Sequence, residues 1–216
     1  MKKVLVSLLI SGGCTALVGS GFAQSDCSAI YPAPKVGDYA ERKLTSSREG
    51  IMTIRFAIVG EQQAAGRTHY WMEVMQELPA AAGTLIVQML IPHYPFEAGD
   101  IQDYIVKAPG QPALRVPRQM IEQLGADAAP GPSWREQCAA SQDLGMEQVT
   151  VPAGTFNARH FRAEGKEPTE VWIAAVPFGM VRSVEPGVVM ELAGYGSNAR
   201  SSITEKPEDI QLPPSR

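Results

Sequence analysis

The sequence predicts a mainly β domain of the α+β class, built on an antiparallel sheet. Short runs rich in Val, Ile, Phe and Trp recur along the chain, and turn residues such as Pro152–Gly154 and Pro186–Gly187 separate them. In several runs apolar and polar side chains alternate, which is the two-residue period of a strand. No helical pattern interrupts the first strands, so hairpin-linked neighbours are expected to run antiparallel.

The expected strands follow the chain in order. In residues 51–59 the apolar side chains Met52, Ile54, Phe56 and Ile58 share one face, which is the clearest alternation of the N-terminal half. Gly125 and Ser133 have the character of a helix stop and a helix cap, and they predict short helices over 118–124 and 134–140. The predicted strands are 36–44, 51–59, 67–78, 84–91 and 101–107, followed by a meander over 149–198.

The first residues have the pattern of a secretory signal peptide. Lys2 and Lys3 precede the apolar run 4–10, which is too short for a comfortable membrane span, and cleavage is expected after Ala23. Lipidation at Cys14 is not expected, because Ser rather than Leu lies three residues before it. The prediction is a periplasmic protein with residues 1–23 as signal peptide, 24–204 as a single domain and 205–216 as a flexible tail.

The charge of the chain argues against nucleic acid as a partner. The sequence has 19 basic and 23 acidic residues. Loss of Lys2 and Lys3 with the signal leaves 17 basic against 23 acidic side chains, a net charge of −6. Phosphate binding needs a basic surface, which this balance does not predict. No segment after the signal is apolar for long enough to span a bilayer.

Two cysteines remain after signal cleavage, and we expect Cys27 and Cys138 to form a disulfide. An even cysteine count in an exported protein is typical of paired cysteines. Such a bridge would tie the mature N-terminus to the middle of the domain. The alternative is a free, catalytic Cys138, but no histidine neighbours it in the sequence.

No motif in the chain predicts a catalytic centre, a metal site or a cofactor. The three histidines, His69, His93 and His160, are far from one another and from cysteines, so zinc is not expected. A hydrolase remains an alternative, because His69 and Glu73 lie four apart in a predicted strand and therefore on one face.

Large and flexible apolar side chains offer a different kind of site. If the sheet curls, they could line a cavity for an acyl chain or another apolar ligand. The alternative is that they are simply core residues. The candidate ligand-binding residues are Trp71, Met89, Phe156, Trp172 and Met190.

The C-terminal meander resembles exported bacterial proteins of the periplasmic lipoprotein-carrier (LolA/LolB-like) superfamily. The matching elements are Val151–Phe156, Val171–Ile173, Pro177–Gly179, Glu191–Leu192 and Tyr195–Gly196. The resemblance implies a strongly curved antiparallel sheet, a half-barrel, with short helices on its concave side. Its best-known members carry the acyl chains of lipoproteins across the periplasm.

These observations lead to one main hypothesis and two alternatives. The main hypothesis is a periplasmic, non-enzymatic protein that binds a lipid, an acyl chain or another apolar ligand. The first alternative is an envelope interaction module that adds a partner strand at a sheet edge. The second is the small secreted hydrolase that would use His69 and Glu73.

Overall fold

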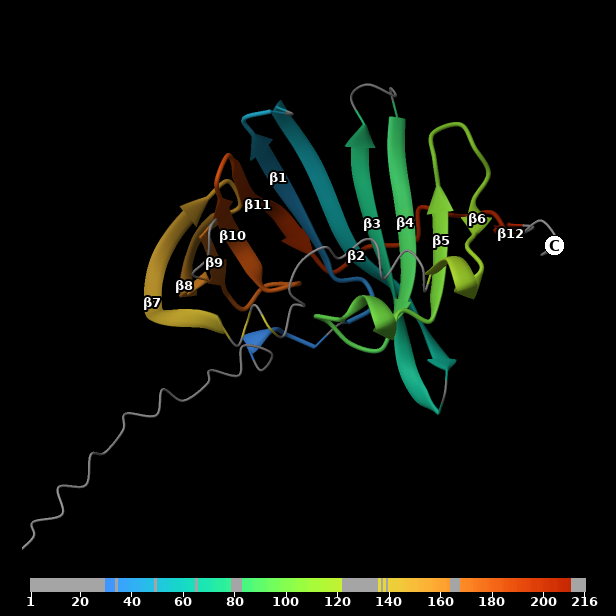
Figure 1. Cartoon of the computed structure of the whole chain (residues 1–216), viewed down its shortest axis with the longest axis horizontal. Coiled ribbons are helices and arrows are strands. Elements are labelled where there is room, and N and C mark those ends of the chain that lie inside the picture. The colour runs from blue at the N-terminus through green and yellow to red at the C-terminus, as the bar shows by residue number, and fades with distance from the viewer. Residues whose placement is uncertain are drawn as a thin grey trace, which may run out of the picture.

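The computed structural model describes residues 30–33, 35–48, 50–64, 66–78, 83–121, 136, 138, 140–163 and 168–210. Strands dominate these residues, as the alternation predicts (Figure 1). In chain order the strands are β1 (Tyr39–Ser46), β2 (Gly50–Ala64), β3 (Arg67–Leu78), β4 (Gly83–Ile91), β5 (Asp103–Lys107), β6 (Leu114–Arg115), β7 (Ser141–Val151), β8 (Gly154–Ala163), β9 (Thr169–Ile173), β10 (Met180–Glu185), β11 (Val188–Gly196) and β12 (Glu208–Asp209).

All twelve strands belong to one sheet, in the order β12-β6-β5-β4-β3-β2-β1-β11-β10-β9-β8-β7. The central strand β1 pairs with β2 on one side and with β11 on the other, so it joins the two β-rich halves of the chain. Each pair is antiparallel except β12 with β6, which is parallel. The sheet is therefore mixed and open, with β12 and β7 at its ends.

Turn residues place the strand ends where the sequence predicts them. Gly187 joins β10 to β11 at φ 79°, and Gly154 follows the turn after β7 at φ 133°. Both dihedral angles lie in a region that glycine adopts readily. The strand predicted for residues 67–78 is confirmed as β3, whereas β2 continues to Ala64, beyond the predicted end at 59.

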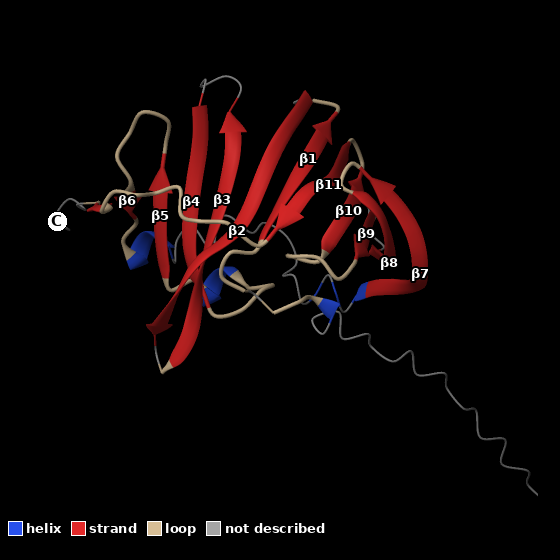
Figure 2. Ribbon diagram, turned by 180° about the vertical axis from the view of Figure 1, so that it is seen from behind, coloured by secondary structure: helices blue, strands red, loops and turns tan. Residues whose placement is uncertain are grey.

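The predicted helical cover of the concave side is not confirmed. Residues 118–121 are helical, as are Glu136, Cys138 and Ala140, and Ala98–Asp100 form the short 3-10 helix η3. The rest of both predicted helices lies outside the described residues. The parts that are described do not form a helical layer over the sheet (Figure 2).

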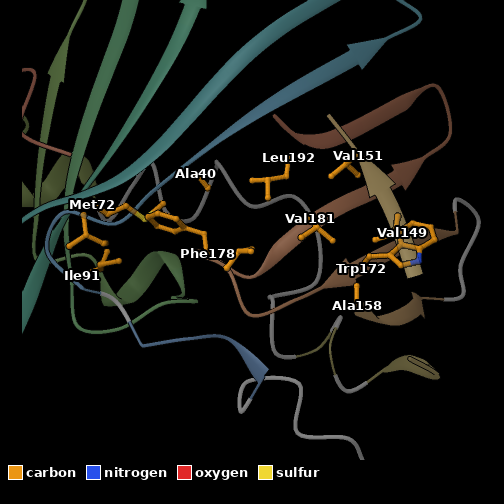
Figure 3. Packing of buried hydrophobic residues seen from close by; sticks show 12 residues of the cluster. Ala40, Met72, Ile91, Val149, Val151, Ala158, Trp172, Phe178, Val181 and Leu192 are labelled. Carbon is orange, nitrogen blue, oxygen red and sulfur yellow. The ribbon is translucent and has the colours of Figure 1, made fainter. Parts of the chain in front are cut away.

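The main core lies on the concave face, where the curled end of the sheet approaches the long strands. Met72 and Ile91 from β3 and β4 belong to the same cluster of buried side chains as Val149 and Trp172 from β7 and β9 (Figure 3). Ala153 N also donates to Leu192 O at 3.0 Å, so the β7–β8 turn lies against β11. The curvature of the sheet thus brings residues from distant strands into one core.

The convex face is crossed by the segment 197–210, which we call the strap (Figure 2). Its start lies against Gly37, which has φ 99°, and a Cβ atom there would lie 2.6 Å from Ser197 O. Ile203 of the strap packs with Ile86, Ile105 and Ala113 in a second, smaller core cluster. The strap then adds β12, in which Glu208 and Asp209, within the range predicted as a flexible tail, pair with β6.

Candidate functional site

A row of apolar side chains on the concave face is only partly buried, and we call it the open apolar face. Leu44 of β1 lies between Met52 of β2 and Met190 of β11 in the register of the sheet. Val87 of β4 lies opposite Val106 of β5, which continues the same face. The members of the open apolar face are Leu44, Met52, Ile54, Leu85, Val87, Val106 and Met190.

None of these side chains belongs to either core cluster of the described residues. A polar side chain, Gln76, lies between Ile54 and Leu85 in the register of this face, and its Nε2 donates to Met52 Sδ at 3.5 Å. A contiguous, partly exposed apolar surface on a concave sheet is typical of a binding site rather than of ordinary protein surface. The open apolar face is therefore the candidate site.

The neighbouring half of the concave face is closed by aromatic side chains. Phe178 packs edge-to-face on Tyr94, with ring centroids 5.1 Å apart, and lies 6.0 Å from the ring of Phe56. The cavity between Ile58, Tyr94 and Phe178 has a volume of only about 10 Å³. Because such a space holds at most one water molecule, this half of the face is filled by the protein itself.

Arg42 lies at the boundary between the filled half and the open apolar face. Its register partners are Ile54 and Leu192, both apolar, and its side chain is 3% exposed. The guanidinium lies over the ring of Phe56, 4.7 Å from its centroid, and Nη2 donates to Phe178 O at 3.1 Å. Within the described residues, Nε has no hydrogen-bond partner.

The Phe178 turn that accepts this hydrogen bond has an unusual backbone. Phe178 has φ 60°, in the left-handed region that residues with a side chain rarely adopt. Gly179 follows at φ 63°, and its amide donates to Val176 O at 2.9 Å. The predicted Pro177–Gly179 turn is thus present, and it places a strained residue directly over Arg42.

The five residues predicted to bind a ligand do not line a single cavity. Trp172 is buried in the main cluster, and Met89 and Phe156 pack against it. Trp71 lies on the other side of the sheet, against the small cluster under the strap. Met190 alone belongs to the open apolar face. Ligand binding by these residues remains a prediction.

Trp172 is part of a charged group of side chains on β7, β8 and β9. His160 stacks on its ring with centroids 4.2 Å apart, and His160 Nε2 lies 3.1 Å from Glu170 Oε2. Arg162 donates to Glu170 and lowers the pKa of that carboxyl, and His160 lowers it further. Trp172 Nε1 donates to Glu147 Oε1. The stacking on His160 and the hydrogen bond to Glu147 therefore hold the indole of Trp172 in place, and its role here is in packing.

On the convex face, Glu73 is 0% exposed and its carboxylate accepts three hydrogen bonds. Gln88 Nε2 and Ser202 N donate to Oε2 at 2.8 and 2.9 Å, and Ser202 Oγ donates to Oε1 at 2.8 Å. Gln88 Nε2 also donates to Ser201 Oγ at 2.7 Å. Glu73 thus fastens the strap to the centre of the sheet.

His69 lies on the same strand and is also 0% exposed. Its Nδ1 lies 3.2 Å from Arg67 O, and its Nε2 has no hydrogen-bond partner among the residues that the structure covers. Neither His69 nor Glu73 is at a surface that a substrate could reach. Both residues are therefore enclosed by the protein itself, and this geometry does not support the hydrolase alternative.

A shallow cleft of about 330 Å³ lies at the other end of the sheet, beside β5 and β6. Both signs of charge line it, and Arg115 Nε lies 3.3 Å from Asp103 Oδ2. Because the charges are mixed, the cleft selects no obvious class of ligand.

The remaining sequence predictions fall partly outside the described residues. Cys27 is among those left out, so the Cys27–Cys138 disulfide stays a prediction. Within the residues that the structure covers, no three His, Cys, Asp or Glu side chains are grouped to hold a metal ion. No helix in this part of the chain is long and apolar enough to cross a membrane.

Sequence reasoning missed Arg42, although the sequence contains its signal. Ala40, Arg42 and Leu44 alternate along the first strand and share one face, so a lone arginine interrupts an otherwise apolar row. Such a charge on the packed face of a strand is rare unless it is paired. That rarity is a reason to single the residue out.

These features define a large, open, strand-dominated sheet with an apolar site on its concave face. No family model and no curated protein sequence matches the chain. Among solved structures, a Bacteroides fragilis protein described as exported, with a YmcC-like fold, has a TM-score of 0.38 and 10% identity over 77% of this chain and 98% of its own. A Parabacteroides distasonis protein described as a lipoprotein has a TM-score of 0.39 at 10% identity, over 77% and 98%.

MucB is also similar, with a TM-score of 0.42 and 11% identity over 78% of this chain and 55% of MucB. Likenesses at these scores carry no argument about function. Membership of the lipoprotein-carrier superfamily therefore remains a prediction from the sequence.

Proposed function

We propose that the protein is an exported, non-catalytic binding protein that holds an apolar ligand on the open apolar face. The observation that supports this most directly is the continuous register of partly buried apolar side chains across β11, β1 and β2, centred on Leu44. Protein surfaces seldom leave such a face without a partner. The curl of the sheet makes the face concave, which favours a ligand that it can partly enclose.

A lipid or acyl chain is the ligand class that suits this surface best. The methionines Met52 and Met190 on either side of Leu44 are flexible and adapt to a chain of variable shape. The resemblance to lipoprotein carriers points to the same class. The expected signal peptide, residues 1–23, would deliver the protein to the periplasm, where such ligands occur.

Two measurements test the proposal. Native mass spectrometry of protein purified from the periplasm is expected to show a bound lipid. The uncharged fluorophore N-phenylnaphthylamine is expected to bind and to be displaced by fatty acids. A protein that carries no lipid and binds no fluorophore would contradict the proposal.

A matched pair of variants locates the site. Leu44→Glu places a carboxylate on the open apolar face, and we expect fluorophore affinity to fall about tenfold, because a buried charge is costly. Thr45→Glu places the same group on the opposite, exposed face of β1 and should leave affinity unchanged. Equal effects of the two variants would show that the fluorophore binds elsewhere.

The edge strand β7 supports a second candidate function, the addition of a partner strand. Leu144 and Met146 on this strand are 40% and 60% exposed, which is unusual for large apolar side chains. A photo-crosslinking residue at position 146 should then capture an envelope protein in cells, and the same residue at exposed Tyr195 should not. A lack of crosslinks from 146, or the same products from both positions, would exclude the edge as the contact.

A further inference from the structure

Arg42 carries a buried positive charge that the described residues do not neutralise. The ion pairs among them involve other side chains. Among the described residues, Arg42 contacts the carbonyl of Phe178 and the ring face of Phe56. A buried guanidinium ordinarily pairs with a carboxylate or phosphate, because leaving water without such a partner is strongly unfavourable.

The hydrogen-bonding capacity of Arg42 is also incomplete. A guanidinium has five N–H groups arranged in a planar fork that matches the two oxygens of a carboxylate or the oxygens of a phosphate. Here Nε is buried and has no hydrogen-bond partner in the part of the chain that the structure describes. A buried donor without a partner is rare in folded proteins and requires an explanation.

The surroundings of Arg42 show what kind of ligand could supply the missing partner. Ile54, its neighbour across the strand pair, belongs to the open apolar face, so apolar surface begins beside the guanidinium. A molecule that fits both features has an anionic end and an apolar body. A small inorganic anion would leave the apolar face uncovered, and an uncharged hydrocarbon would leave Nε without a partner.

We propose that the ligand is an anionic amphiphile, whose carboxylate or phosphate head binds Arg42 while its aliphatic chain lies along the open apolar face. This assignment rests on the proposed function above and adds the chemical class of the ligand. Because Arg42 and Phe178 are both nearly buried, the head group enters by displacing the Phe178 turn. The left-handed backbone of Phe178 makes that turn a strained one, which favours its displacement.

The neighbouring strand provides a matched control. Arg55 of β2 lies over the ring of Tyr39, 4.5 Å from its centroid, and its Nη1 lies 4.0 Å from Met75 Sδ. Like Arg42, it stacks on an aromatic ring, but its register partner Met75 lies on the convex face. Arg55→Met therefore removes a comparable stacked charge without touching the proposed site.

The first experiment compares chains of one length with different heads on the unmodified protein. Myristate and tetradecyl phosphate are expected to displace N-phenylnaphthylamine at concentrations about tenfold lower than tetradecanol, since hydrogen bonds to charged groups are the strong ones. Comparison of the two anions shows whether a carboxylate or a phosphate fits better. Equal affinities for the alcohol and both anions would overturn the inference and leave the proposed function intact. If no chain binds, the proposed function itself fails.

The second experiment uses variants. Arg42→Met is expected to reduce the preference for the anions over tetradecanol to about twofold or less, while fluorophore binding is retained. Arg42→Lys keeps the charge and should retain part of the preference, and Arg55→Met should retain all of it. A preference that survives in a folded Arg42→Met protein would overturn the inference.

Discussion

Each face of the sheet has a buried charged side chain, Glu73 on the convex face and Arg42 on the concave face, and the two differ in how their hydrogen-bonding groups are satisfied. On the convex face, the Glu73 carboxylate accepts three hydrogen bonds from Gln88 and Ser202. On the concave face, Arg42 donates to the backbone carbonyl of Phe178, and its Nε has no hydrogen-bond partner among the described residues. Both side chains are almost completely buried, with exposed fractions of 0% and 3%.

We use this difference in hydrogen bonding to distinguish a buried charge that stabilises the fold from one that is proposed to bind a ligand. A buried polar group whose partners all come from the same chain fixes the fold, because every partner must be in place at once. A buried polar group that lacks partners destabilises the fold and is retained where a ligand supplies them. On this basis Glu73 fastens the strap, whereas Arg42 is the residue for which we propose a ligand.

The largest effect is expected from Glu73→Ala. The substitution removes the carboxylate that accepts from Gln88 Nε2 and Ser202 N, and with it one of the attachments of the strap to the sheet. We expect the free energy of unfolding to fall by about 3 kcal/mol, measured by urea denaturation. Glu77→Ala removes an exposed carboxylate from the same strand and should change stability by less than about 0.5 kcal/mol. Similar losses in the two variants would remove the distinction on which the comparison rests.

A smaller effect is expected from Arg42→Met in the ligand-free protein. The methionine loses the bond to Phe178 O and the stacking on Phe56, but it also removes an unneutralised buried charge. Since these effects oppose each other, stability should change by less than about 1 kcal/mol in either direction. A loss as large as that of Glu73→Ala would make Arg42 a structural residue and would break the comparison.

Local patterns were sufficient to predict most of the strands. Residues 67–78 form β3 as predicted, since alternation and flanking turn residues are properties of a short stretch. The pairing of β1 with β11 and the return of the strap to β6 depend on contacts between distant residues. The polar, proline-containing end of the chain gave no sign that Glu208 and Asp209 would pair with β6.

Less of the candidate site could be predicted, because side-chain type alone does not say which face of the sheet a residue occupies. Trp71 and Met89 were grouped as large apolar side chains, yet they lie on opposite sides of the sheet. Register decides this, and a shift of one residue reverses the face. Arg42 was overlooked because its lack of a partner is a property of the folded chain.

The smallest effect on stability is expected at a solvent-accessible ion pair, Arg162 with Glu170, which extends the comparison beyond the two buried charges. Arg162 donates to Glu170 and lowers the pKa of that carboxyl in the folded protein. A depressed pKa stabilises the folded state above the unfolded pKa of the glutamate, about 4.3, and this contribution is lost as the pH falls through the folded pKa. Because Arg162 is 41% exposed at its side chain, solvent screens the pair strongly.

We therefore expect Arg162→Gln to lower stability by less than about 0.5 kcal/mol at neutral pH, and to have no effect at a pH below the folded pKa of Glu170. Urea denaturation across this pH range measures both values. The loss should be several times smaller than that of Glu73→Ala. If Arg162→Gln lowered stability at neutral pH as much as Glu73→Ala does, burial would not be what distinguishes strongly from weakly stabilising charges in this protein. The contrast between Glu73 and Arg42 would then need another cause.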